Sequence, residues 1–563
     1  AGDDVIDGGD GDDVITSGTG DDTVTGGAGI DDIRFATANL TLADTVDAGE
    51  GVDLLTISDA ATLADADFTG VTNVETLEFE AATTSVVLGA EAAEAGIVTI
   101  DNKAVVTSLT LGATFTNDVS ITLAAANLND NILAGSYTGV LSLAEAADNI
   151  DGNDTFTGGT GTSDTLTITS SSTAITDTEM AGVTAFDTIA FKTNVANVGL
   201  TLNDANVAAG KSLTVDGSAM TSTVLTVSLA NEADGVVTVI GGGAADAITG
   251  SSSTLGDVIN GNGGADLIKF ASANLTLLDT VGGGAGTDKL QITDAATVID
   301  TDFTLVTNVE ELTLLGAGTA VTLDTLATAT GIVTIDGTAD FNSTITLKAG
   351  YTANATIKLD NDVDSVTATA YTADLTVNVG DVDNLTAADT LTGGTGTDTL
   401  EFTLDATTDA LVSGAAAKIT NFEKFLVKTD DAVTITLHDA TIASGKALTI
   451  DGTAMATQAL TVVGTAETNG ALTVLGGSGA DVITGTASSI GDTLNGNAGN
   501  DIFNFASANL TALDTIDGGA GTTDAIVLSD VGVLADTDFT GVTNVEKLTT
   551  FTGNNGIINV VLG

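Results

Sequence analysis

The sequence predicts an all-β protein, an elongated parallel β-helix or β-solenoid built from short strands. Three observations favour this fold. Thr alternates with Val, Ile or Leu in many short stretches, as in strands with one buried face. Asn, Asp and Gly recur between these stretches, as turns between solenoid rungs require. Proline is absent from all 563 residues, which suits long ladders because proline cannot donate a hydrogen bond.

The first elements are consecutive nine-residue repeats at the start of the chain. Residues 8–16, 17–25 and 26–34 fit Gly-Gly-x-Gly-x-Asp-x-U-x, where U is a large apolar residue and Ser17 replaces one Gly. The aspartates of these repeats and of the end of an earlier turn are Asp4, Asp13, Asp22 and Asp31. The apolar residues, which we expect inside the strands, are Ile6, Ile15, Val24 and Ile33.

The chemistry of this repeat points to calcium. Glycine lets the backbone turn sharply and present carbonyl oxygens, and each aspartate adds a carboxylate. Ca²⁺ takes roughly six to eight oxygen ligands, which such turns supply. One turn cannot close a site alone. The alternative is a flexible linker rich in Gly and Asp, and the apolar position that recurs in phase argues against it.

The same pattern returns in two later clusters and in single turns, and together these contain the candidate calcium ligands. In the first cluster they are Asp4, Gly9, Gly11, Asp13, Gly18, Gly20, Asp22, Gly27, Gly29 and Asp31. In the second they are Gly241, Gly243, Asp246, Asp257, Gly261, Gly263 and Asp266. In the third they are Gly477, Gly479, Asp481, Asp492, Gly496, Gly499 and Asp501. Single turns, which are weaker signals, add Asp53, Asp164, Asp288 and Asp398, and a further turn at 518–521 adds no predicted ligand.

These nonapeptides resemble the repeats of the RTX (repeats-in-toxin) family. The resemblance implies a parallel β-roll in which calcium ions lie between successive turns. The composition, which is acidic, free of Cys and rich in Thr, Ala, Gly and Val, resembles that of calcium-dependent surface-layer (S-layer) proteins of Gram-negative bacteria. That second resemblance implies type I secretion, folding on calcium outside the cell and self-assembly into a sheet or fibre.

Between the clusters the chain repeats itself with one long period. Ala-Asn-Leu-Thr recurs at Asn39, Asn274 and Asn509, and both intervals (274 − 39 and 509 − 274) equal 235. The segments 202–205 and 437–440 are separated by the same period. The chain thus holds about 2.4 tandem copies of one unit, and such repeats mainly contact their neighbours. Because the chain begins inside a calcium repeat and stops early in a third copy, we expect a fragment of a longer protein.

The expected organisation follows these repeats. RTX β-rolls are expected at 1–57, 241–292 and 476–526. β-Solenoid is expected at 58–150 and 293–389, and β-solenoid with one RTX-like turn at 151–240 and 390–475. Residues 527–563 would be the truncated start of a third solenoid unit. Short helical turns are expected at 59–68 and 204–210, with little helix elsewhere.

Composition and charge limit the partners. There are 77 Asp and Glu residues against 13 Lys and Arg, a net charge of −64, yet 43% of residues are hydrophobic. These values agree if carboxylates face bound cations and apolar residues line a core. A basic patch for nucleic acid is missing, and no apolar run reaches the length of a membrane span. Cysteine is absent, so disulfides cannot stabilise the fold.

No catalytic constellation is evident, so an enzyme is not expected. His438 is the only histidine, and Asn203 takes its place one period earlier, which suggests a surface residue. A zinc protease needs two or more histidines, and a thiol nucleophile needs Cys. A Gly-x-Ser-x-Gly elbow, typical of RTX lipases, is not found.

Three functions remain open. The first is a calcium-dependent extracellular structural protein that self-assembles into a surface layer or filament. The second is the stalk of a large RTX adhesin, and the third is the non-catalytic, calcium-binding region of a secreted enzyme. The expected cofactor is Ca²⁺ at several sites, and the expected partner is the protein itself. Surface polysaccharide bridged through calcium is a further candidate partner.

Overall fold

The structure is a computed structural model that describes residues 1–60, 62–82, 85–105, 107–124, 129–196, 198–295, 297–340, 342–403, 409–550 and 559–561. Over these residues the chain forms an all-β, parallel β-solenoid of about 22 turns with 8% helix. The predicted fold class is confirmed, while the division into 235-residue copies stays a prediction. The chain divides into two compact units, residues 1–270 with 274–289, and residues 271–273 with 290–563.

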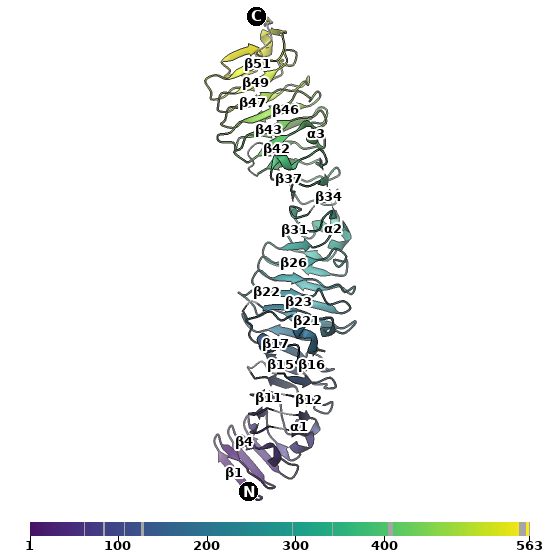
Figure 1. Ribbon diagram of the computed structural model, residues 1–563, viewed down its shortest axis with the longest axis vertical. Coiled ribbons are helices and arrows are strands. Elements are labelled where there is room, and N and C mark those ends of the chain that lie inside the picture. Colours follow the sequence, from purple (N-terminus) through teal and green to yellow (C-terminus); the bar gives the residue numbers. More distant parts are fainter. Residues whose placement is uncertain are drawn as a thin grey trace. The chain divides into compact units, whose positions relative to one another are not determined.

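The first unit contains strands from four parallel sheets (Figure 1). One sheet comprises β1 (Val5–Asp10), β3 (Thr23–Ala28), β5 (Thr45–Glu50) and β8 (Val71–Thr72). The longest run comprises β2 (Val14–Thr16), β4 (Asp32–Phe35), β6 (Leu54–Ile57), β9 (Thr76–Phe79), β11 (Thr99–Asn102), β13 (Val119–Thr122), β15 (Leu141–Glu145), β17 (Thr165–Ile168), β19 (Thr188–Phe191), β21 (Ser212–Asp216), β23 (Val236–Ile240), β25 (Val258–Asn260) and β27 (Thr280–Gly282). A third comprises β7 (Thr62–Leu63), β10 (Ser85–Leu88), β12 (Leu109–Leu111), β14 (Asn131–Leu133), β16 (Thr155–Thr157) and β18 (Val183–Thr184). The fourth comprises β20 (Val198–Thr201), β22 (Leu225–Ser228), β24 (Ala247–Thr249) and β26 (Leu267–Phe270).

The second unit repeats this plan. Its longest run comprises β28 (Lys289–Ile292), which starts at the last residue of the first unit, β31 (Glu311–Leu314), β33 (Thr334–Asp336), β35 (Ala355–Lys358), β37 (Leu375–Asn378), β39 (Thr399–Phe402), β42 (Lys424–Val427), β44 (Ala447–Asp451), β46 (Ala471–Leu475), β48 (Thr493–Asn495), β50 (Thr515–Asp517) and β53 (Val542–Thr543). Another sheet comprises β29 (Thr297–Val298), β32 (Ala320–Leu323), β34 (Thr344–Leu347), β36 (Ser365–Thr367), β38 (Thr390–Thr392) and β41 (Ile419–Thr420). A third comprises β40 (Asp409–Leu411), β43 (Val433–Thr436), β45 (Leu460–Val463), β47 (Val482–Thr484), β49 (Ile502–Phe505), β51 (Ala525–Leu528) and β54 (Lys547–Thr550). The remaining strands are β30 (Val306–Thr307), β52 (Val533–Ala535) and β55 (Asn559–Val561).

Helices in the described residues are single turns at the corners of the rungs. The α-helices are α1 (Ala90–Glu94), α2 (Thr325–Thr328) and α3 (Ser413–Ala416). The 3₁₀ turns are η1 (Thr37–Asn39), η2 (Asp65–Phe68), η3 (Ala147–Asn149), η4 (Glu179–Gly182), η5 (Asp204–Asn206), η6 (Asp300–Phe303), η7 (Val382–Asn384) and η8 (Asp536–Phe539). The two expected helical turns are present, as η2 within 59–68 and η5 within 204–210.

Apolar residues stack in register from rung to rung and form the core. In the first unit Ile15 pairs with Ile33, Ile33 with Leu55, and Leu55 with Leu77. All four are at most 6% exposed. Burial alternates along β4 and β21, whereas in β6 and β9 the next residues, Thr56 and Glu78, are buried as well. The period-two pattern of the sequence is therefore the inside–outside alternation of a parallel solenoid.

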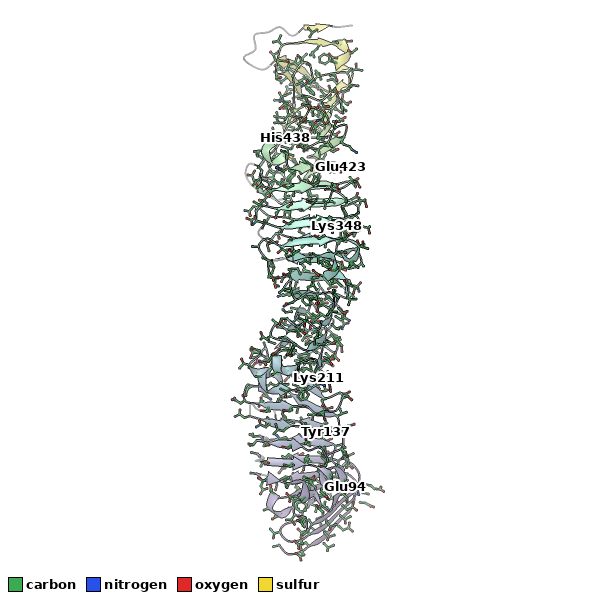
Figure 2. All side chains as sticks on the ribbon, turned by 90° about the vertical axis from the view of Figure 1, so that its right-hand side faces the viewer. Glu94, Tyr137, Lys211, Lys348, Glu423 and His438 are labelled. Carbon is green, nitrogen blue, oxygen red and sulfur yellow. The ribbon has the colours of Figure 1, made fainter. Side chains whose placement is uncertain are left out.

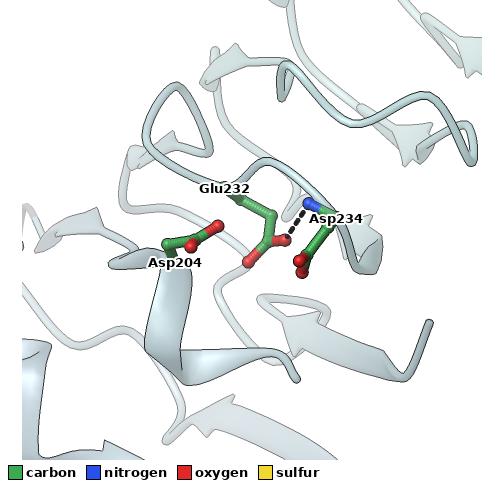
Figure 3. A group of neighbouring side chains, drawn as sticks. All are labelled: Asp204, Glu232 and Asp234. Carbon is green, nitrogen blue, oxygen red and sulfur yellow. Dashed lines mark hydrogen bonds between the residues drawn. The ribbon is translucent and has the colours of Figure 1, made fainter. Parts of the chain in front are cut away.

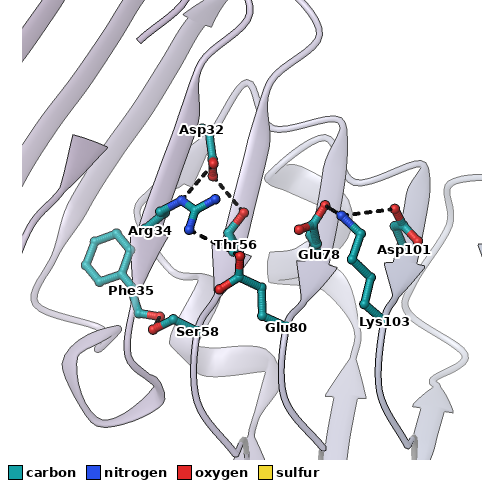
Figure 4. A network of polar contacts seen from close by, with 9 residues as sticks. All are labelled: Asp32, Arg34, Phe35, Thr56, Ser58, Glu78, Glu80, Asp101 and Lys103. Atoms are coloured by element: carbon teal, nitrogen blue, oxygen red, sulfur yellow. Dashed lines mark hydrogen bonds and ion pairs between the residues drawn. The ribbon is translucent and has the colours of Figure 1, made fainter. Parts of the chain in front are cut away.

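Charged side chains on the outer face pair within a rung and between rungs (Figure 4). Arg34 Nε lies 2.7 Å from Asp32, and its Nη1 lies 3.1 Å from Glu80. Lys103 Nζ lies 2.6 Å from Glu78. Because the chain has only 13 basic residues for 77 acidic ones, such pairs can neutralise a small share of the carboxylates. Most of the negative charge must therefore be neutralised by groups other than these basic side chains.

Candidate calcium sites

In the first cluster the repeat aspartates form two hydrogen-bonded ladders on alternating turns. The Asp4 amide donates to Asp22 Oδ1 at 2.8 Å, and the Asp13 amide donates to Asp31 Oδ1 at 2.9 Å. These partners are 18 residues, or two nonapeptides, apart. One carboxylate oxygen of each turn is thus fixed by the backbone of the turn below it.

The ladders extend beyond the nonapeptides. The Asp22 amide donates to Asp44 Oδ1 and the Asp31 amide to Asp53 Oδ1, both at 2.8 Å. The Asp53 amide in turn donates to Glu75 Oε2 at 2.9 Å. The sequence motif does not mark Asp44 or Glu75, because both lie outside the glycine pattern. Their common signal is an acid 22 residues after the previous ladder residue.

The second carboxylate oxygen is different, because it is buried and has no hydrogen-bond partner in the described part of the chain. This holds for Oδ2 of Asp13, Asp22, Asp31 and Asp53. Asp22, Asp31 and Asp53 are 0–1% exposed. A buried carboxylate oxygen without compensation is strongly unfavourable. A cation near these oxygens would supply that compensation.

The first glycine of a repeat leaves room for that cation. A Cβ built on Gly26, in β3, would overlap the carbonyl oxygen of Ala48, in the paired strand β5. It would also lie 2.5 Å from Asp31 Oδ2. A Cβ on Gly8 would likewise fall 2.5 Å from the Gly26 carbonyl oxygen and 2.8 Å from Asp13 Oδ2. A carboxylate and a carbonyl oxygen from two turns thus converge over a residue that has no side chain. This oxygen-only set fits Ca²⁺.

The second and third clusters contain the same open arrangement. Oδ2 of Asp266, Asp501 and Asp524 is buried and unpartnered among the described residues. The glycines whose lack of a side chain leaves space beside these oxygens are Gly261, Gly496 and Gly518.

Burial, together with the charges of neighbouring aspartates, raises the pKa of Asp266 and of Asp501 to about 7. Near neutral pH these carboxylates are therefore held in an environment that disfavours their charge. A bound cation would reverse that preference, because it stabilises the ionised form.

Four predicted aspartates instead have Oδ2 bound by an amide of their own turn. Asp164 accepts from Gly159 at 2.7 Å, Asp246 from Gly242 at 2.6 Å, Asp398 from Gly394 at 2.5 Å, and Asp481 from Gly477 at 2.9 Å. Their Oδ1 atoms accept the amides of Leu141, Leu225, Leu375 and Leu460. At these four turns any calcium ligand would be an oxygen that also accepts a backbone amide.

Both carboxylate oxygens of Asp257 and of Asp492 also accept hydrogen bonds. Asp257 accepts from the amide and hydroxyl of Ser251 at 2.7 and 3.1 Å, and Asp492 accepts from the amide and hydroxyl of Thr486. Burial raises the pKa of both aspartates to about 6. Each carboxylate thereby fastens the loop between two calcium turns, and their role as ligands stays a prediction.

The other predicted residues are placed as follows. Asp4 is exposed at the end of its ladder, and Asp288 Oδ1 accepts the Asp266 amide at 2.8 Å. Left-handed φ angles are found at Gly9, Gly11, Gly18, Gly20, Gly27, Gly29 and Gly499. The carbonyl oxygens of Gly9, Gly11, Gly27, Gly261 and Gly496 face a glycine of the next turn. The ligand roles of these glycines, and of Gly241, Gly243, Gly263, Gly477 and Gly479, stay predictions.

Two features escaped the sequence pattern. Asp524 follows Gly518 by six positions instead of the usual five, and its Oδ1 accepts the Asp501 amide at 2.8 Å. Asn262 and Asn497 adopt φ angles of 67° and 66°, and their side-chain amides donate to the Gly241 and Gly476 carbonyls. The signal for Asp524 is a repeat with one inserted residue. The signal for the asparagines is Gly-Asn in place of Gly-Gly.

Stacked parallel turns that bring carbonyl and carboxylate oxygens together define a calcium-binding β-roll. A family model described as the RTX calcium-binding nonapeptide repeat (4 copies) matches residues 1–33, 385–404 and 475–509. The protein is therefore a parallel β-solenoid with RTX calcium-binding β-rolls. A search of curated proteins found no match to the chain. In its described part, no helix is long and apolar enough to cross a membrane.

Proposed function

We propose that this protein is a structural protein that folds on calcium outside the cell and assembles with copies of itself into a surface layer or filament. The observation that carries the proposal is the set of buried, unpartnered carboxylate oxygens at three separate levels of the solenoid, among the residues described. Each level needs a cation to be stable. The ions would therefore be part of the framework.

The charge of the chain supports folding after export. A net charge of −64 opposes compaction until cations bind. Extracellular calcium modules typically bind at about 10⁻⁴ to 10⁻³ M, well above the concentration inside cells. Because metal binding energy at such sites is folding energy, the chain would stay loose in the cytoplasm and fold outside it.

Recurring exposed apolar side chains support assembly. In the first unit Leu255 is 46% exposed and Leu278 is 52% exposed, and a Cβ on Gly256 would touch Leu278. In the second unit, one period later, Ile490 is 39% exposed and Leu513 is 66% exposed. We call Leu255, Leu278, Ile490 and Leu513 the apolar loop patches. Side chains that repeat along an assembling protein give it equivalent contacts at each level.

Electron microscopy of the purified chain tests this function. In about 10 mM CaCl₂, roughly tenfold or more above the binding range expected of extracellular calcium modules, we expect a lattice or a regular polymer that disperses in excess chelator. Isolated particles at every protein concentration would overturn self-assembly and favour a stalk. The matched variants Leu255→Ser with Leu278→Ser should keep the calcium-dependent circular dichroism spectrum and weaken the polymer. If the polymers are unchanged in these variants, the apolar loop patches do not contribute to the assembly interface.

A further inference from the structure

Three carboxylates gather outside the nonapeptide repeats (Figure 3). Asp204 begins η5, and Glu232 and Asp234 lie in the turn between β22 and β23. One carboxylate oxygen of each lies within 4.8 Å of the other two. Figure 3 shows Glu232 between the two aspartates. The group joins two levels of the solenoid, because Asp204 Oδ1 also accepts the Ala233 amide at 3.0 Å.

Glu232 is the buried centre of this cluster. Its side chain is 0% exposed. Oε1 accepts the amides of Asp234 at 3.0 Å and Gly235 at 2.6 Å. Oε2 is buried and has no hydrogen-bond partner in the part of the chain that the structure describes. The backbone thus holds one oxygen rigidly, and the other is left for a ligand.

The surroundings of Glu232 disfavour its charge. Burial raises its pKa, and the amides of Gly235 and Asp234 oppose that rise, while the charges of Asp204 and Asp234 add to it. A positive charge beside the three groups would stabilise the ionised form of Glu232. The two aspartates are exposed, so a cation here would keep contact with solvent and bound water.

A related arrangement recurs one period later, at Asp439, Glu467 and Asn469, where the Asn469 side-chain amide donates to Asp439 Oδ1 at 3.2 Å. Glu467 is 0% exposed, and its Oε1 accepts the amides of Asn469 at 2.9 Å and Gly470 at 2.8 Å. Glu467 Oε2 is again buried and unpartnered among the described residues, and so is Asn469 Oδ1. Asp439 Oδ1 accepts the Thr468 amide at 2.9 Å. A second copy that leaves the same oxygen open argues against an accident of one turn.

We propose that Asp204, Glu232 and Asp234 bind a calcium ion outside the nonapeptide repeats, and that Asp439, Glu467 and Asn469 form a second, weaker calcium site. The ligands are all oxygens, which suits a hard cation. Ca²⁺ accepts flexible coordination by several carboxylates, whereas Mg²⁺ demands a near-ideal octahedron and usually keeps several waters, so a group of three carboxylates suits calcium better. Asn469 is neutral where Asp234 is charged, so the second site binds less tightly.

The proposed ion would fasten the turn at 229–235 to η5 one level below it. The Ser252 amide, in the loop that Asp257 fastens, donates to the Glu232 carbonyl at 3.0 Å, and the Ala487 amide donates to the Glu467 carbonyl at 2.8 Å. Each ion would therefore brace the solenoid where a calcium β-roll begins. This inference is independent of the nonapeptide ions and of the proposed assembly.

Crystallography of the whole chain in CaCl₂ tests the first site directly. We expect anomalous difference density for calcium within about 2.3–2.6 Å of Glu232 Oε2. If the nonapeptide turns contain ions and this position contains none, the proposal is wrong. Because this test uses the wild-type protein, its result does not depend on whether a variant at Glu232 folds.

Hydrogen exchange during a calcium titration tests both sites in solution. In Glu232→Gln the midpoint for peptides covering 229–236 should rise by about tenfold or more, because one ligand charge is lost. The midpoint for 464–471 should stay unchanged. Asp234→Asn should move the first midpoint toward the second, and the matched variant Asn469→Asp should lower the second. Unchanged midpoints in these variants, with folding intact by circular dichroism, would overturn the proposal.

Discussion

Asp31 provides the sharpest test of the calcium ladder, because one substitution should change stability in opposite directions with and without the ion. In Asp31→Asn the side chain keeps Oδ1, which accepts the Asp13 amide at 2.9 Å. It loses the charge on the buried Oδ2, which is unpartnered among the described residues. The variant therefore separates the metal ligand from the backbone hydrogen bond.

The size of the effect follows from mass action. A site with a Kd of about 10⁻⁴ M in about 10 mM calcium is at roughly 100 times its Kd, which stabilises the folded turn by about 2.7 kcal/mol. Loss of that site would speed amide exchange in β4 and β6 by up to about 100-fold. In chelator the sign reverses. Burial raises the pKa of Asp53, the Asp31 amide opposes that rise, and the charges of Asp31 and Glu75 add to it. Removing the Asp31 charge should therefore make the apo turn more stable.

Amide hydrogen exchange is the appropriate assay, because a long repeat array does not unfold in one step. Exchange in β49, far along the chain, should not change, since repeats couple mainly to their neighbours. Asp10→Asn, which removes the same charge from an exposed residue of β1, is the matched control. Equal protection of Asp31→Asn and wild type in calcium would refute the ligand assignment. A matching loss at β49 would refute local coupling.

Three further predictions concern the whole chain and the later clusters. In excess chelator the circular dichroism spectrum should lose β-structure, and a full β spectrum there would contradict calcium-dependent folding. Without calcium, the raised pKa values of Asp266 and Asp501 mean that their protonated carboxyls stabilise the folded state. This stabilisation is present in full below the unfolded pKa of about 4, and it is lost as the pH rises through the folded pKa of about 7. The β signal in chelator should accordingly be larger at about pH 5 than at about pH 8, and no difference would count against buried carboxylates as the cause. Gly26→Ala should abolish calcium protection of β3 and β5, because its Cβ would overlap the Ala48 carbonyl oxygen, whereas Gly210→Ala, with open space around it, should lose only about 1 kcal/mol. Intact calcium protection in Gly26→Ala would show that the site accommodates a Cβ at this position, and would contradict the prediction.

The sequence alone determined the fold class and the position of the calcium turns. Alternation of Thr with apolar residues is a local pattern, and two segments that show it, residues 212–216 and 344–347, are strands. The glycine and aspartate spacing of the nonapeptide is also local. His438, labelled in Figure 2, is half-buried. Its Nδ1 accepts the Ala440 amide as Asn203 Oδ1, one period earlier, accepts that of Ala205, so this contact has a local cause.

Only the tertiary structure decided which aspartates have a free oxygen. Asp31 and Asp246 occupy the same place in their repeats, yet Oδ2 of Asp31 is unpartnered among the described residues, whereas that of Asp246 accepts the Gly242 amide. Glu232 carries no motif at all, and its open oxygen lies beside Asp204, which belongs to a different level of the solenoid. Spacing specifies which oxygens a turn offers. Whether an oxygen also accepts a backbone amide depends on how its own turn and the adjacent turns are folded against each other, which the spacing within one repeat does not specify.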